Sequence, residues 1–204
     1  MKLLAIDGID ATGKSSVVAA LAAAEGVPAL GEFSATPIGD LIRSIVARND
    51  FFYLDSTGKP RVAETFVLAS DLLAKLESAR WIDAPFVVME RGALSLRAYQ
   101  HARIARDIDL DSADEIDTLL RSLFHLSKVD CIDVLLTVNE TVMLRRKAAR
   151  GDPAPSQDEI DILMTAQSFM VSLVEAGGGT IADTSELTLK EVVLAVRAAV
   201  AGWR

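Results

Sequence analysis

The chain has 204 residues, a formal net charge of −8, and a composition in which 50% of the residues are hydrophobic but only 5% are aromatic. That length fits one domain with a sizeable apolar core, so we expect residues 1–204 to form a single domain. The acidic surplus argues against a nucleic-acid partner, because nucleic-acid binders need excess cations to displace phosphate counterions.

The cysteine count and the hydropathy of the sequence indicate where in the cell the protein is expected. The one cysteine, Cys131, excludes an internal disulfide and a cysteine-rich zinc site. Such a chain is typical of a reducing compartment, so we expect a cytoplasmic location. No run of apolar residues is long enough to span a bilayer, which predicts that the protein has no membrane partner. Cys131 begins an apolar run and is expected in the core.

Short apolar runs alternate along the chain with longer segments of helical periodicity. We predict strands at residues 2–6, 27–30, 86–89, 131–138 and 180–182. We predict helices at residues 17–25, 37–48, 62–81, 93–105, 113–125, 140–150, 157–176 and 187–200. Ser112 and Glu115 fit a capping box at the start of one of these helices. The alternation implies an α/β fold of three layers, with a five-stranded parallel sheet flanked by helices.

The segment after the first predicted strand, residues 8–15, reads G-I-D-A-T-G-K-S and fits the phosphate-loop pattern G-x-x-x-x-G-K-[ST] at every fixed position. Glycines there let backbone N–H groups point at phosphate oxygens, and the following helix adds the positive end of its dipole. We expect Lys14 to reach the β- and γ-phosphates and Ser15 to bind Mg²⁺. The residues expected to hold the nucleotide are Gly8, Ala11, Thr12, Gly13, Lys14, Ser15 and Ser16.

A phosphate loop identifies a nucleotide but not a reaction, so a small-molecule kinase, a GTPase switch and a non-catalytic nucleotide-binding protein are all open. Residues 55–58 match the switch pattern D-x-x-G, and residues 127–130 differ by one residue from the guanine-reading pattern [NT]-K-x-D. Asp130 precedes a predicted strand, however, whereas the guanine-reading loop should follow one. Both patterns are short and arise often by chance, so we favour the kinase.

Four segments, in the family's order, make the chain resemble the thymidylate kinases, which are nucleoside monophosphate kinases, along nearly its whole length. Residues 6–10 (I-D-G-I-D) run into the phosphate loop, and residues 36–43 (T-P-I-G-D-L-I-R) are similar to the family's T-P-x-G-x-x-I-R. Residues 90–100 (E-R-G-A-L-S-L-R-A-Y-Q) resemble the longer and more specific motif D-R-Y-x-x-S-x-x-A-Y-Q. Residues 145–152 look like the family's lid.

The resemblance implies a P-loop nucleotide-kinase fold and transfer of the γ-phosphoryl group of ATP to a nucleoside monophosphate, dTMP or a related nucleotide. It also implies that Mg²⁺ takes part and that the protein is a homodimer. By the same resemblance, Asp10 contacts the acceptor sugar, Arg91 grips the acceptor phosphate, and Tyr99 lies beside the sugar 2′ position. Glu90 stands where the family has aspartate and would support Mg²⁺ through water.

A lid is implied as well, around residues 145–157, with an arginine that neutralises the transferring group. Ala11 excludes the phosphate-loop arginine that some members use, which leaves Arg145, Arg146 or Arg150. Arginine suits this task because its fork binds phosphate oxygens bidentately and keeps its charge. The residues expected to be catalytic are Lys14, Asp10, Arg91, Arg146 and Arg150.

The departures from the family cluster around the acceptor. The family has a phenylalanine that stacks on thymine and, four residues on, an arginine that reads the base; here these are Leu68 and Leu72. Phe33 or Phe66 could stack instead, and Gly92 replaces an aromatic residue. Either a divergent thymidylate kinase uses other contacts, or the scaffold phosphorylates another acceptor, such as a modified nucleotide, a nucleoside or a small phosphate ester. The residues expected around the acceptor are Asp10, Phe33, Leu68, Leu72, Arg91, Ser95 and Tyr99.

The remaining apolar and aromatic residues have more general interpretations. Small and apolar residues around Ala69 and Leu73 fit either the core or a dimer face. We expect His101 to be a surface or half-buried helix residue. Trp81 and Trp203 are expected to cap the core or an interface.

Overall fold

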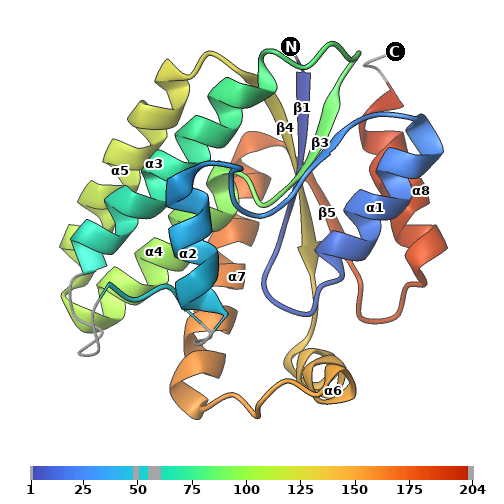
Figure 1. Cartoon of the computed structure of the whole chain (residues 1–204). Coiled ribbons are helices and arrows are strands. Elements are labelled where there is room, and N and C mark those ends of the chain that lie inside the picture. Colours follow the sequence, from blue (N-terminus) through green and yellow to red (C-terminus); the bar gives the residue numbers. More distant parts are fainter. Residues whose placement is uncertain (1, 48–50, 55–60, 202–204) are drawn as a thin grey trace.

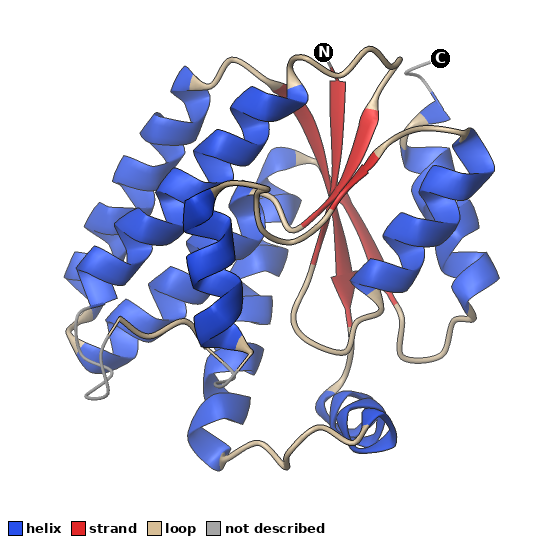
Figure 2. Cartoon of the chain, viewed as in Figure 1, coloured by secondary structure: helices blue, strands red, loops and turns tan. Residues whose placement is uncertain are grey.

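The computed structural model describes residues 2–47, 51–54 and 61–201, and this part of the chain has helices on both faces of one parallel sheet (Figures 1 and 2). The strands are β1 (Lys2–Asp7), β2 (Ala29–Leu30), β3 (Val87–Glu90), β4 (Asp130–Thr137) and β5 (Thr180–Asp183). The helices are α1 (Lys14–Glu25), α2 (Pro37–Val46), α3 (Arg61–Ala79), α4 (Ala93–Asp107), α5 (Leu110–Leu126), α6 (Glu140–Arg150), α7 (Gln157–Gly177) and α8 (Leu189–Ala199). The strand order β2-β3-β1-β4-β5 confirms the predicted five-stranded parallel sheet.

Side-chain alternation along the central strand β1 divides the core between the two faces of the sheet. Leu4 and Ile6 pack with Leu21 of α1 and with residues of α8 on one face. Leu3 and Ala5 pack on the other face, against α3 and α5. Figure 1 shows this division, with α1 and α8 on one side of the sheet and α3, α4, α5 and α7 on the other. Because the strands are parallel, the loops that follow β1, β2 and β3 meet at one edge, where ligands bind in open α/β sheets.

Two helices begin earlier than predicted, each for a local reason. Helix α1 begins at Lys14, because Gly13 takes a left-handed conformation with φ 91° and ends the phosphate loop directly at the helix. Helix α5 is capped by Asp109, whose side chain accepts a hydrogen bond from Ser112 N at 2.6 Å. The predicted capping box of Ser112 and Glu115 is therefore wrong, because a carboxylate three residues earlier already satisfies that amide.

Burial corrects three predictions about single residues. Cys131 is exposed, because the first two residues of β4 are exposed and the strand is fully buried only from Val134. Trp81 is 89% exposed in the turn after α3, so it does not cap the core. His101 is buried, because its ring stacks on that of Phe169 with 3.9 Å between the centroids.

Helix α3 contributes core residues where a dimer face was an open alternative. Ala69 is buried and Leu73 is half-buried, and both pack into the cluster between α3, α5 and the sheet. They therefore belong to the core. The exposed apolar residues of α3 are Val62 and Phe66 instead.

The fold does not support a GTPase switch at either of the two matching patterns. Residues 127–130 lead into β4 rather than follow it, which is the wrong end of the strand for a guanine-reading loop. The D-x-x-G match at residues 55–58 lies outside the described residues, as does Trp203.

Helix α7 is, among the described residues, the one helix whose length and mean hydropathy of 1.2 would fit a membrane span. This differs from our expectation that no segment reaches that limit. Leu163, Ala166 and Met170 of α7 are buried and share one cluster with Ala98 and Ala102 of α4. A long apolar helix that is covered along one face in this way behaves as a core helix of a folded domain.

Candidate active site

The phosphate loop joins β1 to α1 and is held by hydrogen bonds of its own. Thr12 Oγ1 and Lys14 Nζ both donate to the carbonyl of Ile9 at 2.8 Å. Gly8 has φ 145°, and a Cβ at this position would lie 2.4 Å from the carbonyl oxygen of Leu136. Only glycine fits where the loop passes the end of β4, so the motif takes the shape that its glycines predict.

Lys14 is buried in this loop, and its ammonium group has an unusual pKa. Burial, and then the nearby charge of Arg91, lower the pKa of Lys14 from 10.5 to about 8. Both causes disfavour the charged form, whereas an anion beside the ammonium group would favour it. A phosphate group beside Lys14 would therefore stabilise the charged form of the ammonium group and raise its pKa again.

Ser15 and Glu90 bring two oxygen ligands together at the start of α1. Ser15 Oγ donates to Glu90 Oε1 at 2.8 Å. Mg²⁺ prefers such hard oxygen ligands and keeps several water molecules. No group of three or more His, Cys, Asp and Glu side chains suited to a metal occurs in the described part of the chain. The pair fits Mg²⁺ as an ion that takes its other ligands from phosphate groups and water.

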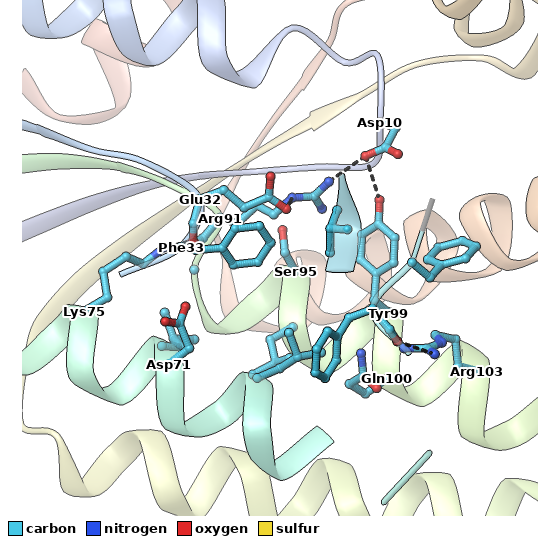
Figure 3. A pocket seen from close by; sticks show the side chains of 17 residues that line it. Asp10, Glu32, Phe33, Asp71, Lys75, Arg91, Ser95, Tyr99, Gln100 and Arg103 are labelled. Carbon is cyan, nitrogen blue, oxygen red and sulfur yellow. Dashed lines mark hydrogen bonds and ion pairs between the residues drawn. The ribbon is translucent and has the colours of Figure 1, made fainter. Parts of the chain in front are cut away.

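Arg91 lies at the centre of the site, and oxygen atoms surround its guanidinium group (Figure 3). Its Nη2 lies 2.6 Å from Asp10 Oδ1, its Nε lies 2.7 Å from Glu32 Oε1, and its Nη1 donates to the Gly8 carbonyl at 3.3 Å. The guanidinium carbon lies 4.9 Å from the centre of the Tyr99 ring. Burial alone would lower the pKa of Arg91, but Tyr99 and the two carboxylates raise it well above its usual value. Arg91 is therefore a permanent cation between two anions.

Two adjoining cavities meet at this arginine. The phosphate cavity lies over the phosphate loop and is lined by Asp10, Ala11, Gly13, Lys14, Ser15, Ser16, Glu32, Glu90, Arg91 and Arg150. The acceptor cavity, shown in Figure 3, is lined by side chains that include Phe33, Leu68, Asp71, Leu72, Lys75, Ser95, Tyr99, Gln100 and Arg103. Asp10, Glu32 and Arg91 line both cavities. Ligands in the two cavities would meet at these three side chains.

All seven residues predicted to surround an acceptor line the acceptor cavity. Leu68 and Leu72 line it from α3, so the two positions that the thymidylate kinases fill with phenylalanine and arginine are apolar here. Phe33 brings an aromatic ring to the cavity from the loop after β2 (Figure 3). Phe66 is 40% exposed and is not part of the lining, so Phe33 is the better placed of the two replacements that the sequence offered.

The predicted lid arginines have different surroundings. Arg146 donates to the Ala11 carbonyl at 3.0 Å and to Thr184 Oγ1 at 2.9 Å, so it ties α6 to the phosphate loop and to the end of β5. Arg150 is exposed, pairs with Asp152 at 2.5 Å and lines the phosphate cavity. Of the two lid arginines predicted to be catalytic, Arg150 is the one with access to a bound phosphate.

Steric crowding explains why residue 92 is a glycine, where the thymidylate kinases have an aromatic residue. A Cβ at Gly92 would lie 2.8 Å from Ala5 Cβ and 3.1 Å from Asp7 Oδ2. The backbone N–H of Gly92 and that of Ser95 both donate to Asp7 Oδ1 at 2.9 Å, which holds the start of α4 against β1. A larger side chain has no room at this point.

Several polar residues of the acceptor cavity escaped sequence reasoning. Glu32, Lys75 and Arg103 are the clearest examples. Arg103 is buried, and its guanidinium group donates to Glu64 at 2.8 Å. One signal was present for Lys75: it follows Asp71 by four residues, so two charged side chains share one face of a helix whose neighbours are apolar. The partners of these three side chains lie far away in the sequence, so they could not be inferred from residue spacing.

Known structures share this architecture, although no protein-family model and no curated protein matches the sequence. A thymidylate kinase from Candida albicans matches with a TM-score of 0.69 and 15% identity, over 98% of this chain and 91% of its own. Deoxyadenosine kinase from M. mycoides with bound dATP matches with a TM-score of 0.67 and 14% identity, over 98% of this chain and 100% of its own. The same enzyme with dCMP and a flexible dCDP matches with a TM-score of 0.63 and 15% identity, over 99% of this chain and 100% of its own.

The chain has the fold of P-loop nucleotide kinases. The fold class predicted from the sequence is confirmed. At 14–15% identity the similarity concerns the fold, and the chemistry must be argued from the site itself.

Replacing Asp10 with asparagine should weaken phosphoryl transfer far more than ATP binding. Burial would raise the pKa of Asp10, but Arg91, Lys14 and Lys147 hold it below its usual value, so the native group is a carboxylate. The amide keeps the size but loses the charge that orients Arg91. We expect the transfer rate to fall about 100-fold, the scale of a small misplacement of reacting groups.

Steady-state rates and an ATP titration would measure the two effects of Asp10→Asn separately. Asp117→Asn is the matched control, because Asp117 pairs with Arg97 at 2.7 Å and lines neither cavity. A transfer rate equal to that of the native protein would remove Asp10 from the site.

Proposed function

We propose that this protein transfers the γ-phosphoryl group of ATP to a nucleoside monophosphate, dTMP or a related nucleotide. One observation carries the proposal: the phosphate cavity and the acceptor cavity share Asp10, Glu32 and Arg91. Phosphoryl transfer needs little covalent chemistry and depends on in-line positioning and on cations around the moving group. A shared wall with a permanent cation supports such a reaction.

Each part of the site has a role in this proposal. The phosphate loop and Lys14 bind the β- and γ-phosphates of ATP. Ser15, and Glu90 through water, would hold Mg²⁺, which would neutralise phosphate charge. Arg91 binds the acceptor phosphate through its fork. Arg150 approaches the transferring group as the lid closes, which also excludes water.

The residues that line the acceptor cavity favour an acceptor base other than thymine, which the thymidylate kinases recognise with an arginine. Leu68 and Leu72 offer contact surface but no hydrogen bonds to a base edge. Phe33 supplies an aromatic face, and the other polar lining includes Gln100, whose Oε1 accepts from Thr65, and Arg103, which pairs with Glu64. A base read by these groups would gain its selectivity from different polar partners.

A second candidate, a nucleoside with a free 5′-hydroxyl as acceptor, is favoured by the ion pair between Glu32 and Arg91. The carboxylate lies 2.7 Å from Arg91 Nε, on the boundary of the two cavities. An incoming phosphate must compete with this anion, whereas a hydroxyl group needs a nearby base to take its proton.

A coupled ADP-release assay across deoxynucleoside monophosphates, nucleosides and other small phosphate esters tests the proposal. Activity with a monophosphate supports the first candidate, activity with a nucleoside supports the second, and no activity with any acceptor contradicts both. Competition between ATP and GTP for the pure protein separates these candidates from a guanine-nucleotide switch, and nucleotide affinity without turnover would indicate a binding protein.

Replacing Glu32 with glutamine distinguishes the two candidates further. With a nucleoside acceptor, loss of the general base should lower the rate by about 10²- to 10⁴-fold. With a monophosphate acceptor, the rate should hold or rise, because a charge that competes for Arg91 is removed. Glu77→Gln, at an exposed position of α3, is the control. A large loss with a monophosphate would contradict this assignment of Glu32.

We also propose a cytoplasmic homodimer that binds neither nucleic acid nor membranes. The free thiol of the exposed Cys131 suits a reducing compartment. Val62 and Phe66 of α3, together with Leu119 of α5, offer exposed apolar surface for a second copy. Light scattering of the purified protein would measure the assembly.

A further inference from the structure

Lys75 is a buried lysine whose ammonium group binds backbone rather than side chains. Its Nζ donates to the carbonyls of Glu32 at 2.8 Å, Glu90 at 2.9 Å and Arg91 at 2.9 Å, and lies 3.3 Å from that of Gly31. The side chain is 3% exposed. An ammonium group has three protons, so these carbonyls use its full donor capacity.

The four carbonyls belong to two segments at one end of the sheet, of which the first has left the ladder and the second still pairs with β1 through Glu90 and Ile6. Strand β2 has two residues and pairs with β3 only through Ala29 and Leu30, so the chain after Leu30 has left the ladder. Strand β3 ends at Glu90, and Arg91 has a left-handed conformation with φ 56°. Lys75 therefore cross-links two chain segments just where they leave the sheet.

These segments carry Glu32, Glu90 and Arg91, whose side chains line the phosphate cavity. Loss of the cross-link would remove one restraint on each side of the ion pair between Glu32 and Arg91, although the Arg91 N–H would still donate to the Ile6 carbonyl at 3.1 Å. The phosphate loop follows β1, and none of the carbonyls that Lys75 binds belongs to it. The side chain thus acts on the wall between the two cavities, and it does not bind the phosphate loop, which supplies most of the contacts to the ATP phosphates.

The surrounding charges explain why a lysine is tolerated at this depth. Burial lowers the pKa of Lys75 to about 8, although Asp7, Asp71, Glu32 and Glu90 all act to raise it. The carboxylate of Asp71 is occupied by the backbone N–H of Ser34, at 3.2 Å, and by its hydroxyl group, at 2.5 Å. The ammonium group is therefore free for the carbonyls, while the anions around it offset the cost of burying its charge.

We propose that Lys75 is a positioning residue for phosphoryl transfer, which holds Glu32 and Arg91 at the boundary of the two cavities by cross-linking the segments that follow β2 and β3. The inference rests on the kinase function proposed above. It assigns to Lys75 no contact with ATP. Its loss should therefore damage use of the acceptor and the transfer step while ATP affinity is preserved.

The test compares Lys75→Met, which keeps the apolar stem, with Lys75→Arg, which keeps a charge and N–H donors. In Lys75→Met we expect kcat/KM for the acceptor to fall about 100-fold while the Kd for ATP stays within about threefold. Lys75→Arg should regain about tenfold of that loss. Arg97→Met is the control for general destabilisation, because Arg97 forms a half-buried ion pair with Asp117 and lines neither cavity.

Three results would overturn the proposal: native kcat/KM in Lys75→Met, an equal loss of ATP affinity, or the same selective loss in Arg97→Met. Hydrogen exchange gives a readout that does not depend on activity. In Lys75→Met, amide exchange should accelerate in residues 31–34 and 90–92 and stay unchanged in residues 8–15. If Lys75→Met does not fold, Lys75→Arg is compared with the native protein instead. Native amide exchange together with native kcat/KM in Lys75→Arg would contradict the proposal, because it would show that the site does not require the ammonium group of Lys75.

Failure of the kinase function would be recognised separately. A native protein that phosphorylates no acceptor contradicts the proposed function, whatever the variants do. Unchanged exchange in residues 31–34 and 90–92 of a folded Lys75→Met contradicts the role of Lys75, whatever the acceptor proves to be.

Discussion

Replacing Lys14 with methionine should reduce phosphoryl transfer by at least about 10³-fold, which corresponds to about 4 kcal/mol of transition-state stabilisation. Lys14 Nζ is held by the Ile9 carbonyl at 2.8 Å and lines the phosphate cavity. Its charge is the one that the phosphate loop itself brings to the β- and γ-phosphates. Methionine keeps the apolar stem, so the fold should persist while that charge is lost.

The measurement is the ADP-release rate at saturating acceptor, together with a thermal unfolding curve. Lys190→Met, at an exposed position of α8, removes a lysine without touching either cavity and should behave as the native protein. Full activity in a folded Lys14→Met would show that the phosphate loop is not used for transfer.

The lowered pKa of Lys14 adds a pH dependence with a definite sign. Because the pKa is about 8 rather than 10.5, the ammonium group of the free protein loses its proton as the pH rises through about 8. Loss of that charge weakens the attraction for phosphate, so ATP affinity should fall toward alkaline pH. Lys14→Met lacks the titrating group and should show a weaker dependence. An equal dependence in both proteins would assign it to another group.

Replacing Arg91 with lysine should lower kcat/KM for the acceptor by about 10³-fold, although the positive charge is kept. Arginine here uses separate nitrogens for Asp10, Glu32 and the Gly8 carbonyl. A lysine ammonium group is a single point and cannot hold these partners in the same arrangement. ATP binding should change little, because the phosphate loop supplies most of its contacts.

The acceptor KM, the turnover rate and the ATP affinity of Arg91→Lys need to be measured together. Arg121→Lys, at an exposed position of α5 that lines neither cavity, is the matched conservative control. A native turnover rate in Arg91→Lys would remove the need for a fork at this position and would contradict the proposed arrangement of the acceptor.

The parts of this protein that could be predicted from its sequence are those fixed by local chemistry. The phosphate loop could be predicted because its glycines and Lys14 act within eight consecutive residues. The sheet could be predicted because parallel buried strands are apolar runs separated by helices. Arg91 and Tyr99 were found through one long motif and Asp10 through the segment that runs into the phosphate loop, and the structure brings the three within contact distance of one another.

The parts that could not be predicted depend on contacts between distant segments. Lys75 has its role only because β2 and β3 bring four carbonyls to it. Glu32 could not be assigned from the sequence, because its pairing with Arg91 depends on how the chain leaves β2. The resemblance left Arg145, Arg146 and Arg150 as alternatives, and only the contacts of Arg146 with Ala11 and Thr184 distinguish it from Arg150, which lines the phosphate cavity.

The bond from Arg146 to the Ala11 carbonyl has a mechanical consequence for lid closure. Together with the bonds to Thr184, it holds the middle of α6 against the phosphate loop and the end of β5. Arg150 lies four residues beyond Arg146, a rise of about 6 Å, at the end of α6 and next to the loop at Asp152. If the proposed lid closes, we expect the last turn of α6 to move more than its middle. Because Arg146 binds a carbonyl of the phosphate loop, we also expect movement of the lid to be coupled to that loop.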